Sequence, residues 1–276
     1  MLDAIAPTTV TLPGGLVLEA DHPLHTAELR PLTGREEDWL VHHPSVPSAT
    51  AVTCLLSNCL VRLDTVTSSR ELVGKLLVGD RDYLVLQLRR LTLGDEFRAV
   101  VLCPQCQAPM DVTFHADEIP VETRRQTAPH YSCHLPSRAA KKRAVRYRLP
   151  TGSDQEAVLG LDPVAGVDAL LERCLLDPVR LTRKERQLLM DEMEKQAPSV
   201  ELDLNLQCPN CSHAFIAPFD TTAFFLQEIR SGARHLLREF HTLAFHYHWS
   251  EAEILRLERS RRRTYLSLVS DELQRN

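Results

Sequence analysis

The sequence lacks the features that mark secreted and membrane proteins. Its first residues contain no basic region and no apolar block long enough for a secretory signal. No apolar run approaches the roughly 20 residues that span a bilayer. Since at least four of the eight cysteines have metal-ligand spacing, we expect a reducing cytoplasm and no membrane partner. The length of 276 residues allows one large domain or two modest ones.

Fingerprints of common enzymes are missing as well. The chain has no G-x-S-x-G turn, no Walker loop, no G-x-G-x-x-G segment, and no H-E-x-x-H or H-x-E zinc-enzyme segment. A formal net charge of -5 opposes nucleic-acid binding through bulk charge, and aromatic residues for stacking make up only 5%. We therefore expect a protein that is not an enzyme, has no catalytic residue and does not depend on nucleic acid.

Two cysteine pairs are the most informative feature that is present. Each pair has the form C-P-x-C and follows an apolar, β-prone run, at residues 97–102 and again at residues 200–206. A strand followed by such a turn, given twice, is typical of a zinc ribbon, in which four thiolates hold one tetrahedral Zn²⁺ and leave no position for a substrate. The sequence predicts one structural zinc. Its ligands are Cys103, Cys106, Cys208 and Cys211.

The other cysteines give weaker signals. Cys54, Cys59 and Cys174 lie in helical stretches and are predicted to be buried thiols. Cys133 and His134 leave open a second, catalytic metal site, which would need three ligands and an open position. A redox role for the two C-x-x-C pairs is disfavoured, because neither pair opens a helix after a strand as in a thioredoxin-like unit.

Turn signals and hydrophobic periodicity divide the chain into five segments. The predicted fold class is α+β, and it combines a four-cysteine zinc ribbon, a helical insert and a C-terminal helical hairpin. The first segment is predicted to be an extended arm with short strands, because its prolines leave little room for a helix. The segments are residues 1–47 (arm), 48–120 (helices and first knuckle), 121–199 (mainly helical insert), 200–220 (second knuckle) and 221–276 (C-terminal helical, partner-binding region).

Capping signals predict where several helices begin. Asp80 is expected to cap a helix that carries a leucine stripe. In the insert, Asp162 followed by proline opens one helix, and the capping box at residues 182–185 opens another. Ser231-Gly232 is a predicted joint between two helices, and a capping box at residues 250–253 begins a last helix expected to run to residue 273.

This last helix is the predicted site of partner binding. Three interpretations of its arginines, which lie within residues 256–263, are open. They form a solvated helix face, they are part of a protein interface, or they contact nucleic acid together with Lys141, Lys142 and Arg143. Apolar residues occur on more than one side of the helix, which favours docking to another protein. The residues expected to contact that protein are Trp249, Ile254, Leu257, Arg261, Arg262, Tyr265 and Leu268.

Three parts of the chain resemble known proteins of contractile tails. Residues 12–15 (LPGG) with residues 28–37 (ELRPLTGREE) resemble the opening of the T-even-type phage baseplate family. Residues 79–95, running into the first cysteine pair, are similar to the middle of the same family. Residues 245–266 are similar to short helical proteins of contractile tail gene clusters and to phage tail-assembly chaperones.

The resemblance implies a non-enzymatic assembly protein of the baseplate or hub of a contractile injection system, located in the bacterial cytoplasm, with or without incorporation into the particle. The implied partners are baseplate, hub, spike or tape-measure proteins. Two alternatives remain open: a chaperone that keeps the tape-measure protein soluble, and a zinc-ribbon adaptor for nucleic acid.

Overall fold

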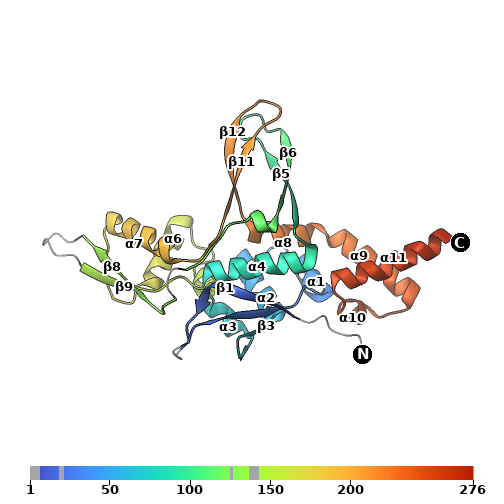
Figure 1. Ribbon diagram of the computed structural model, residues 1–276, viewed down its shortest axis with the longest axis horizontal. Coiled ribbons are helices and arrows are strands. Elements are labelled where there is room, and N and C mark those ends of the chain that lie inside the picture. Colours follow the sequence, from blue (N-terminus) through green and yellow to red (C-terminus); the bar gives the residue numbers. More distant parts are fainter. Residues whose placement is uncertain (1–6, 19–21, 125–126, 137–142, 276) are drawn as a thin grey trace.

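The computed structural model describes residues 7–18, 22–124, 127–136 and 143–275. Figure 1 shows a central body from which two β-hairpins project, with the insert at one end of the body and the C-terminal helices at the other. Helices and strands both contribute throughout, which confirms the α+β class. Among the described residues, no helix combines the length and the hydropathy that a membrane span requires. Lys141 and Lys142 of the nucleic-acid alternative lie outside the described residues.

The body is built from a four-stranded antiparallel sheet with helices packed against it. Alternating leucine, valine and alanine side chains of the strands meet leucine stripes of the helices in one continuous apolar core. Burial of these stripes is the main force that holds the body together. Its elements are β1 (Thr8–Leu16), β2 (Leu24–Leu29), α2 (Ser48–Cys59), β3 (Leu60–Leu63), β4 (Val66–Thr67), α3 (Arg70–Lys75) and α4 (Val78–Leu93).

The predicted extended arm contains a helix, α1 (Gly34–His42), so this expectation is corrected. The prolines at positions 31 and 44 lie just before and just after the helix, where they do not interrupt its hydrogen bonds. The helix begins with a capping box, in which the Thr33 amide donates to the Glu36 carboxylate at 2.8 Å. A local signal for this helix was therefore present in the sequence.

Asp80 does not cap a helix, because α4 begins two residues earlier, with Leu77 as its N-cap. The Asp80 carboxylate is buried and accepts a hydrogen bond from the Gly14 amide at 2.7 Å. A side chain at Gly14 would come within 2.8 Å of the same carboxylate, so glycine permits this close approach. Desolvation raises the pKa of Asp80 to about 6. Its role is to bind the turn in β1 to α4.

The insert combines a β-hairpin with three helices around its own small core. Asp162 caps the second of these helices, and Thr182 and Glu185 form the predicted capping box of the third. A short strand pair joins the entry and exit of the insert. Its elements are β7 (Val121–Glu122), β8 (Tyr131–Leu135), β9 (Arg143–Tyr147), α5 (Gly152–Ala157), α6 (Pro163–Cys174), α7 (Arg183–Gln196) and β10 (Ser199–Val200).

The C-terminal region consists of α8 (Thr221–Ser231), α9 (Ala233–Tyr247), α10 (Glu251–Ile254) and α11 (Arg259–Arg275). The joint at Ser231-Gly232 and the capping box at Ser250 are confirmed, but the single last helix is not. Backbone carbonyls of Leu257 and Leu255 accept hydrogen bonds from the Gly34 and Arg35 amides at 3.1 and 3.0 Å. The free amides at the start of α1 thus hold residues 255–258 in a non-helical turn.

Candidate metal centre

Two hairpins carry the cysteine pairs and project together from the body (Figure 1). The first consists of β5 (Glu96–Leu102) and β6 (Pro109–His115), and the second of β11 (Leu202–Gln207) and β12 (Ala214–Phe219). Their facing side chains form an aromatic cluster near the body. Phe97 stacks on Phe114 at 4.9 Å, and Phe219 meets Phe114 edge-on at 4.9 Å. This packing aligns the hairpins so that their turns meet.

Both cysteine turns have the same backbone geometry. In the first, the Cys103 amide donates to the Ala108 carbonyl at 3.0 Å, and in the second the Cys208 amide donates to the His213 carbonyl at 2.9 Å. Gln107 and Ser212, at equivalent positions, both adopt a left-handed conformation with φ of 59°. Proline after the first cysteine of each pair sets the φ angle that such a turn requires. The sequence repeat is therefore also a structural repeat.

The four sulfur atoms converge at the tip of the paired hairpins. All four lie within 4.8 Å of one another, and the cysteines are free of disulfide bonds. The Sγ atoms of Cys103 and Cys211 are 3.7 Å apart, and those of Cys106 and Cys208 are 3.6 Å apart. The structure thus brings together all four predicted ligands in an arrangement compatible with one metal ion.

Hydrogen bonds at the cluster favour ionised sulfur, but only in part. The pKa of the Cys106 thiol is lowered to about 6 by the Ala108 backbone amide and then by the Asn210 side chain, whose nitrogen lies 3.6 Å from the sulfur. The His213 amide acts in the same direction on Cys211, yet desolvation and the neighbouring cysteines raise the pKa of this thiol to about 12. Four thiolates at this spacing therefore require a cation between them.

Arg89 of α4 anchors the first hairpin to the body. Its buried guanidinium donates to the Glu228 carboxylate of α8 at 3.0 and 3.1 Å, and to the carbonyls of Gly94 and Glu96 at 2.6 and 2.7 Å. The same group lies 3.7 Å from the centre of the Phe97 ring. Sequence reasoning missed this residue. The four-residue spacing of Arg89 from buried Val85, on one face of α4, was the signal that it is internal.

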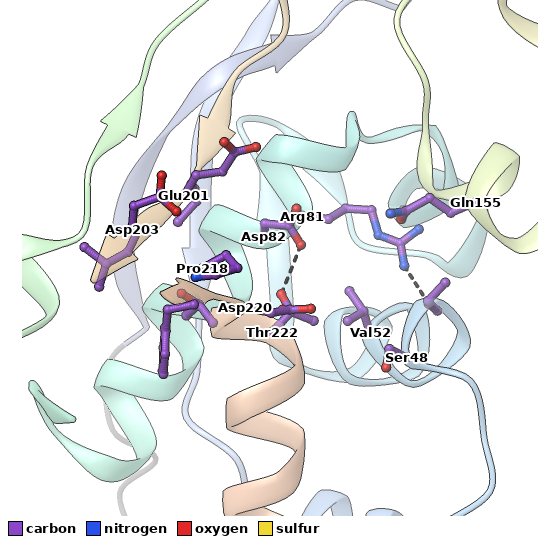
Figure 2. Close-up of a pocket in the computed structure, with 15 residues that line it drawn as sticks. Ser48, Val52, Arg81, Asp82, Gln155, Glu201, Asp203, Pro218, Asp220 and Thr222 are labelled. Atoms are coloured by element: carbon purple, nitrogen blue, oxygen red, sulfur yellow. Dashed lines mark hydrogen bonds between the residues drawn. The ribbon is translucent and has the colours of Figure 1, made fainter. Parts of the chain in front are cut away.

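A cavity of about 410 Å³ lies where the second hairpin joins the body (Figure 2). Four carboxylates line it: Asp82, Glu201, Asp203 and Asp220. Asp82 accepts a hydrogen bond from the Thr222 hydroxyl at 3.0 Å, and desolvation, reinforced by Asp220 and Glu201, raises its pKa to about 6. Within the described part of the chain, only the four cysteines form a group of three or more side chains close enough to share a metal ion.

The remaining cysteines lie outside the four-thiol cluster. Cys133 and His134 join no such group among the residues that the structure describes, so the second metal site is without support. Cys59 and Cys174 are fully buried as predicted, and desolvation raises the pKa of Cys59 well above its usual range and that of Cys174 to about 11. Cys54 is only half-buried, contrary to prediction.

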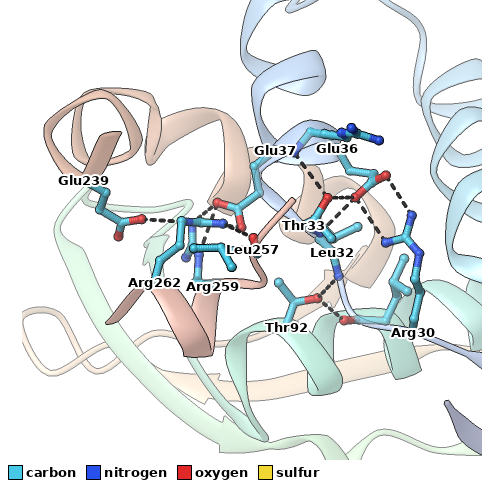
Figure 3. Close-up of polar contacts among 12 residues, drawn as sticks. Arg30, Leu32, Thr33, Glu36, Glu37, Thr92, Glu239, Leu257, Arg259 and Arg262 are labelled. Carbon is cyan, nitrogen blue, oxygen red and sulfur yellow. Dashed lines mark hydrogen bonds and ion pairs between the residues drawn. The ribbon is translucent and has the colours of Figure 1, made fainter. Parts of the chain in front are cut away.

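A buried ion network holds the C-terminal helices against α1 (Figure 3). The Glu37 carboxylate, 1% exposed, pairs with Arg259 and with Arg262, each at 2.9 Å. Arg262 is fully buried, and also donates to the Glu239 carboxylate at 2.8 Å and to the Leu257 carbonyl at 2.9 Å. Every polar group of this guanidinium thus has a partner inside the chain, as burial of a charge requires.

This network changes the interpretation of the predicted partner residues. Ile254, Leu257 and Arg262 are buried within the chain itself, so their side chains serve internal packing, and the expectation that they contact another protein is corrected. Leu268 is half-exposed. For this residue, and for the half-buried Trp249, Arg261 and Tyr265, contact with a partner stays a prediction.

The fold and the cysteine cluster together define an α+β protein with two hairpins joined at a four-thiol centre. A family model described as T4 bacteriophage base plate protein matches residues 16–226. The chain therefore belongs to this family, which confirms the resemblance at residues 28–37 and 79–95, whereas residues 12–15 lie before the matched range. The matched range includes both cysteine turns and ends inside α8, so α9, α10 and α11 lie beyond it. No curated protein and no solved structure matches the chain.

Proposed function

We propose that this protein is a non-enzymatic assembly protein of the baseplate of a contractile, phage-tail-like injection system, and that one structural Zn²⁺ stabilises it. The observation that carries the proposal is the family match over residues 16–226, which spans the body from the end of β1 onward, the insert and both cysteine turns. The protein acts through contacts with other proteins of the baseplate or hub.

The spacing of the sulfur atoms supports zinc as the metal. Zn–S bonds of about 2.3 Å in a tetrahedron place the sulfurs about 3.8 Å apart. The observed separations, 3.7 Å for Cys103 and Cys211 and 3.6 Å for Cys106 and Cys208, agree with that value. With four sulfur ligands the ion has no free position, so its role is to fix the two hairpins relative to each other. Such a zinc ribbon presents a rigid projection to a partner.

The projecting hairpins carry side chains suited to such contacts. Val100 and Leu102 of β5 and Ile216 of β12 are all more than half exposed, although each lies within a regular strand. Apolar side chains at the outer face of a rigid hairpin gain by being covered in an assembly. This exposure supports a role in assembly independently of the family match.

The decisive experiment is to delete the gene from a strain that produces the tail-like particle and to complement it with the tagged full chain. Assembled baseplates should disappear on deletion and return on complementation, in electron micrographs of purified particles. The tagged chain should co-purify with baseplate, hub or spike proteins. Normal particles in the deletion strain would refute the proposal, and co-purification with the tape-measure protein alone would replace it by the chaperone alternative.

A further inference from the structure

Helix α9 has two faces of opposite character. One face packs into the C-terminal core through the buried residues Leu236, Phe240 and Leu243. The opposite face forms a continuous stripe that we call the α9 outer face. It consists of Arg234, Leu237, Arg238, His241 and Phe245, which are all exposed, and each lies three or four residues from at least one other member.

The apolar members of the α9 outer face are unusually accessible. Leu237 is 58% exposed and Phe245 is 68% exposed. They are eight residues apart on the same side of the helix, with His241 between them, and the His241 ring stacks on Phe245 at 6.2 Å. Leucine and aromatic side chains at this spacing are the anchors by which one helix docks against another protein.

The charge on this face has a single sign. Neither Arg234 nor Arg238 forms a hydrogen bond or an ion pair with any other described residue. The only carboxylate of α9 belongs to Glu239, which points inward and pairs with Arg262 at 2.8 Å. By contrast, some exposed charges elsewhere have a partner of opposite sign, as in the contact of Lys75 with Glu71 at 2.7 Å. The α9 outer face is therefore a local basic surface on a chain of net charge -5.

We propose that the α9 outer face binds an acidic, amphipathic segment of another protein of the baseplate; this inference rests on the proposed function. The two arginines lie on the same face of α9 as Leu237 and Phe245, so a partner helix with apolar residues at matching spacing and carboxylates beside them complements both the shape and the charge. The face lies beyond residues 16–226, the range shared with the family. It therefore gives this chain a contact of its own in addition to those of the family.

Site-specific photo-crosslinking in the full chain tests the contact directly. The photoreactive residue p-benzoylphenylalanine replaces Phe245 or Leu237, and the chain is produced together with the particle's own baseplate proteins. A matched control carries the same residue in place of Val164, an exposed apolar position on α6. Sequencing of the crosslinked peptide should identify an acidic segment with apolar residues three or four apart, joined to positions 237 and 245 but not to position 164.

Charge reversal then tests the chemistry of the contact. Arg234→Glu with Arg238→Glu should weaken association with the crosslinked protein by about tenfold, and changing the facing carboxylates of that protein to lysine should restore it. Arg263→Glu, an exposed arginine on α11, serves as control and should have little effect. Loss without restoration, or an equal loss in the control, would overturn the proposal.

The remaining outcomes are equally informative. A crosslink only to a second copy of this chain, only to nucleic acid, or to no protein at all would refute an acidic protein partner. An acidic partner that is not a baseplate protein would support this inference while contradicting the proposed function. Conversely, a chain that restores baseplates but yields no crosslink at positions 237 and 245 would retain the function and refute the inference.

Discussion

Replacement of Glu37 by glutamine tests whether the buried ion network holds the C-terminal helices to the body. The Glu37 carboxylate pairs with Arg259 and Arg262 at 2.9 Å, and Arg262 has no contact with solvent. Removing one partner of a buried ion pair leaves an uncompensated charge and costs about 3–5 kcal/mol. Because Glu239 still binds Arg262, we expect the lower end of this range, about 3 kcal/mol for Glu37→Gln.

Hydrogen–deuterium exchange measures this effect where it should occur. A loss of about 3 kcal/mol corresponds to roughly a hundredfold increase in amide exchange through local opening. The increase should be confined to α9, α10 and α11, which contact the body through this network and through the turn at residues 255–258. Amides of α2 and α4, in the core of the body, should exchange as in the wild type.

Glu71→Gln is the matched control, because it removes a glutamate that pairs with Lys75 at 2.7 Å on an exposed surface. It should leave exchange in the C-terminal helices unchanged. The double variant Glu37→Leu with Arg262→Met replaces the buried pair by apolar groups and should recover part of the lost protection, because Arg259 and Glu239, which lose their partners, retain some contact with solvent. The reasoning would be refuted if Glu37→Gln matched the control, or if exchange rose equally throughout the chain.

Three further predictions follow from the site and the core. Cys208→Ser should abolish the binding of one metal ion per chain, as measured by elemental analysis, and should lower the melting temperature. Cys54→Ser, which lies outside the cluster, should retain the metal. Full retention of the metal in both variants would contradict a metal centre at the four cysteines. Because burial raises the pKa of Asp80 from 3.8 to about 6, the wild type gains stability as the pH falls through 6. The unfolding free energy of Asp80→Asn should exceed that of the wild type by up to about 3 kcal/mol near pH 8, and this advantage should fall to about half near pH 5 and vanish only as the pH approaches about 3; an advantage independent of pH in urea titrations would argue against this. Arg89→Met should cost about 3 kcal/mol and make the first hairpin sensitive to proteolysis, since it leaves Glu228 and two carbonyls without their donor; unchanged proteolysis would exclude the anchoring role.

The four-cysteine cluster could be predicted from the sequence because the geometry of each turn is local. A strand, a proline and two cysteines three residues apart determine each turn, and the repeat of this unit indicates that the two halves meet. The capping boxes at Thr182 and Ser250 were predictable for the same reason, since each is completed within four residues. Features of this kind need no knowledge of the remaining chain.

Features set by distant contacts could not be predicted. The interruption between α10 and α11 depends on amides of Gly34 and Arg35, more than two hundred residues earlier in the chain. Burial of Arg262 depends in the same way on Glu37, which is 225 positions away. Arginines on a helix are normally exposed to solvent, so the sequence alone predicts an exposed Arg262. Its burial can be recognised only when the structure places the Glu37 carboxylate beside it.

For Asp80, the local sequence pattern predicted a helix-capping role that the residue does not have. An aspartate at the start of a leucine-rich helix is a good candidate for an N-cap. The helix begins earlier, however, and the carboxylate binds the Gly14 amide of β1 instead. The contact between Asp80 and Gly14, 66 positions apart, could not be found without the fold.

The cysteine cluster also determines the order in which the chain can reach its native state. Cys106 and Cys208 are separated by 102 positions, and ribosomes add about 5–20 residues per second, so the second turn is synthesised about 5–20 s after the first. During that interval the first turn lacks the two cysteines of the second, while the insert can already fold around its own core. Closure of the four-cysteine cluster is then a late step that joins the ends of a preformed module. The entropic free energy of closing a loop rises by only about 0.6 kcal/mol each time the length of the loop doubles. The insert can therefore change in length with little effect on the stability of the paired hairpins.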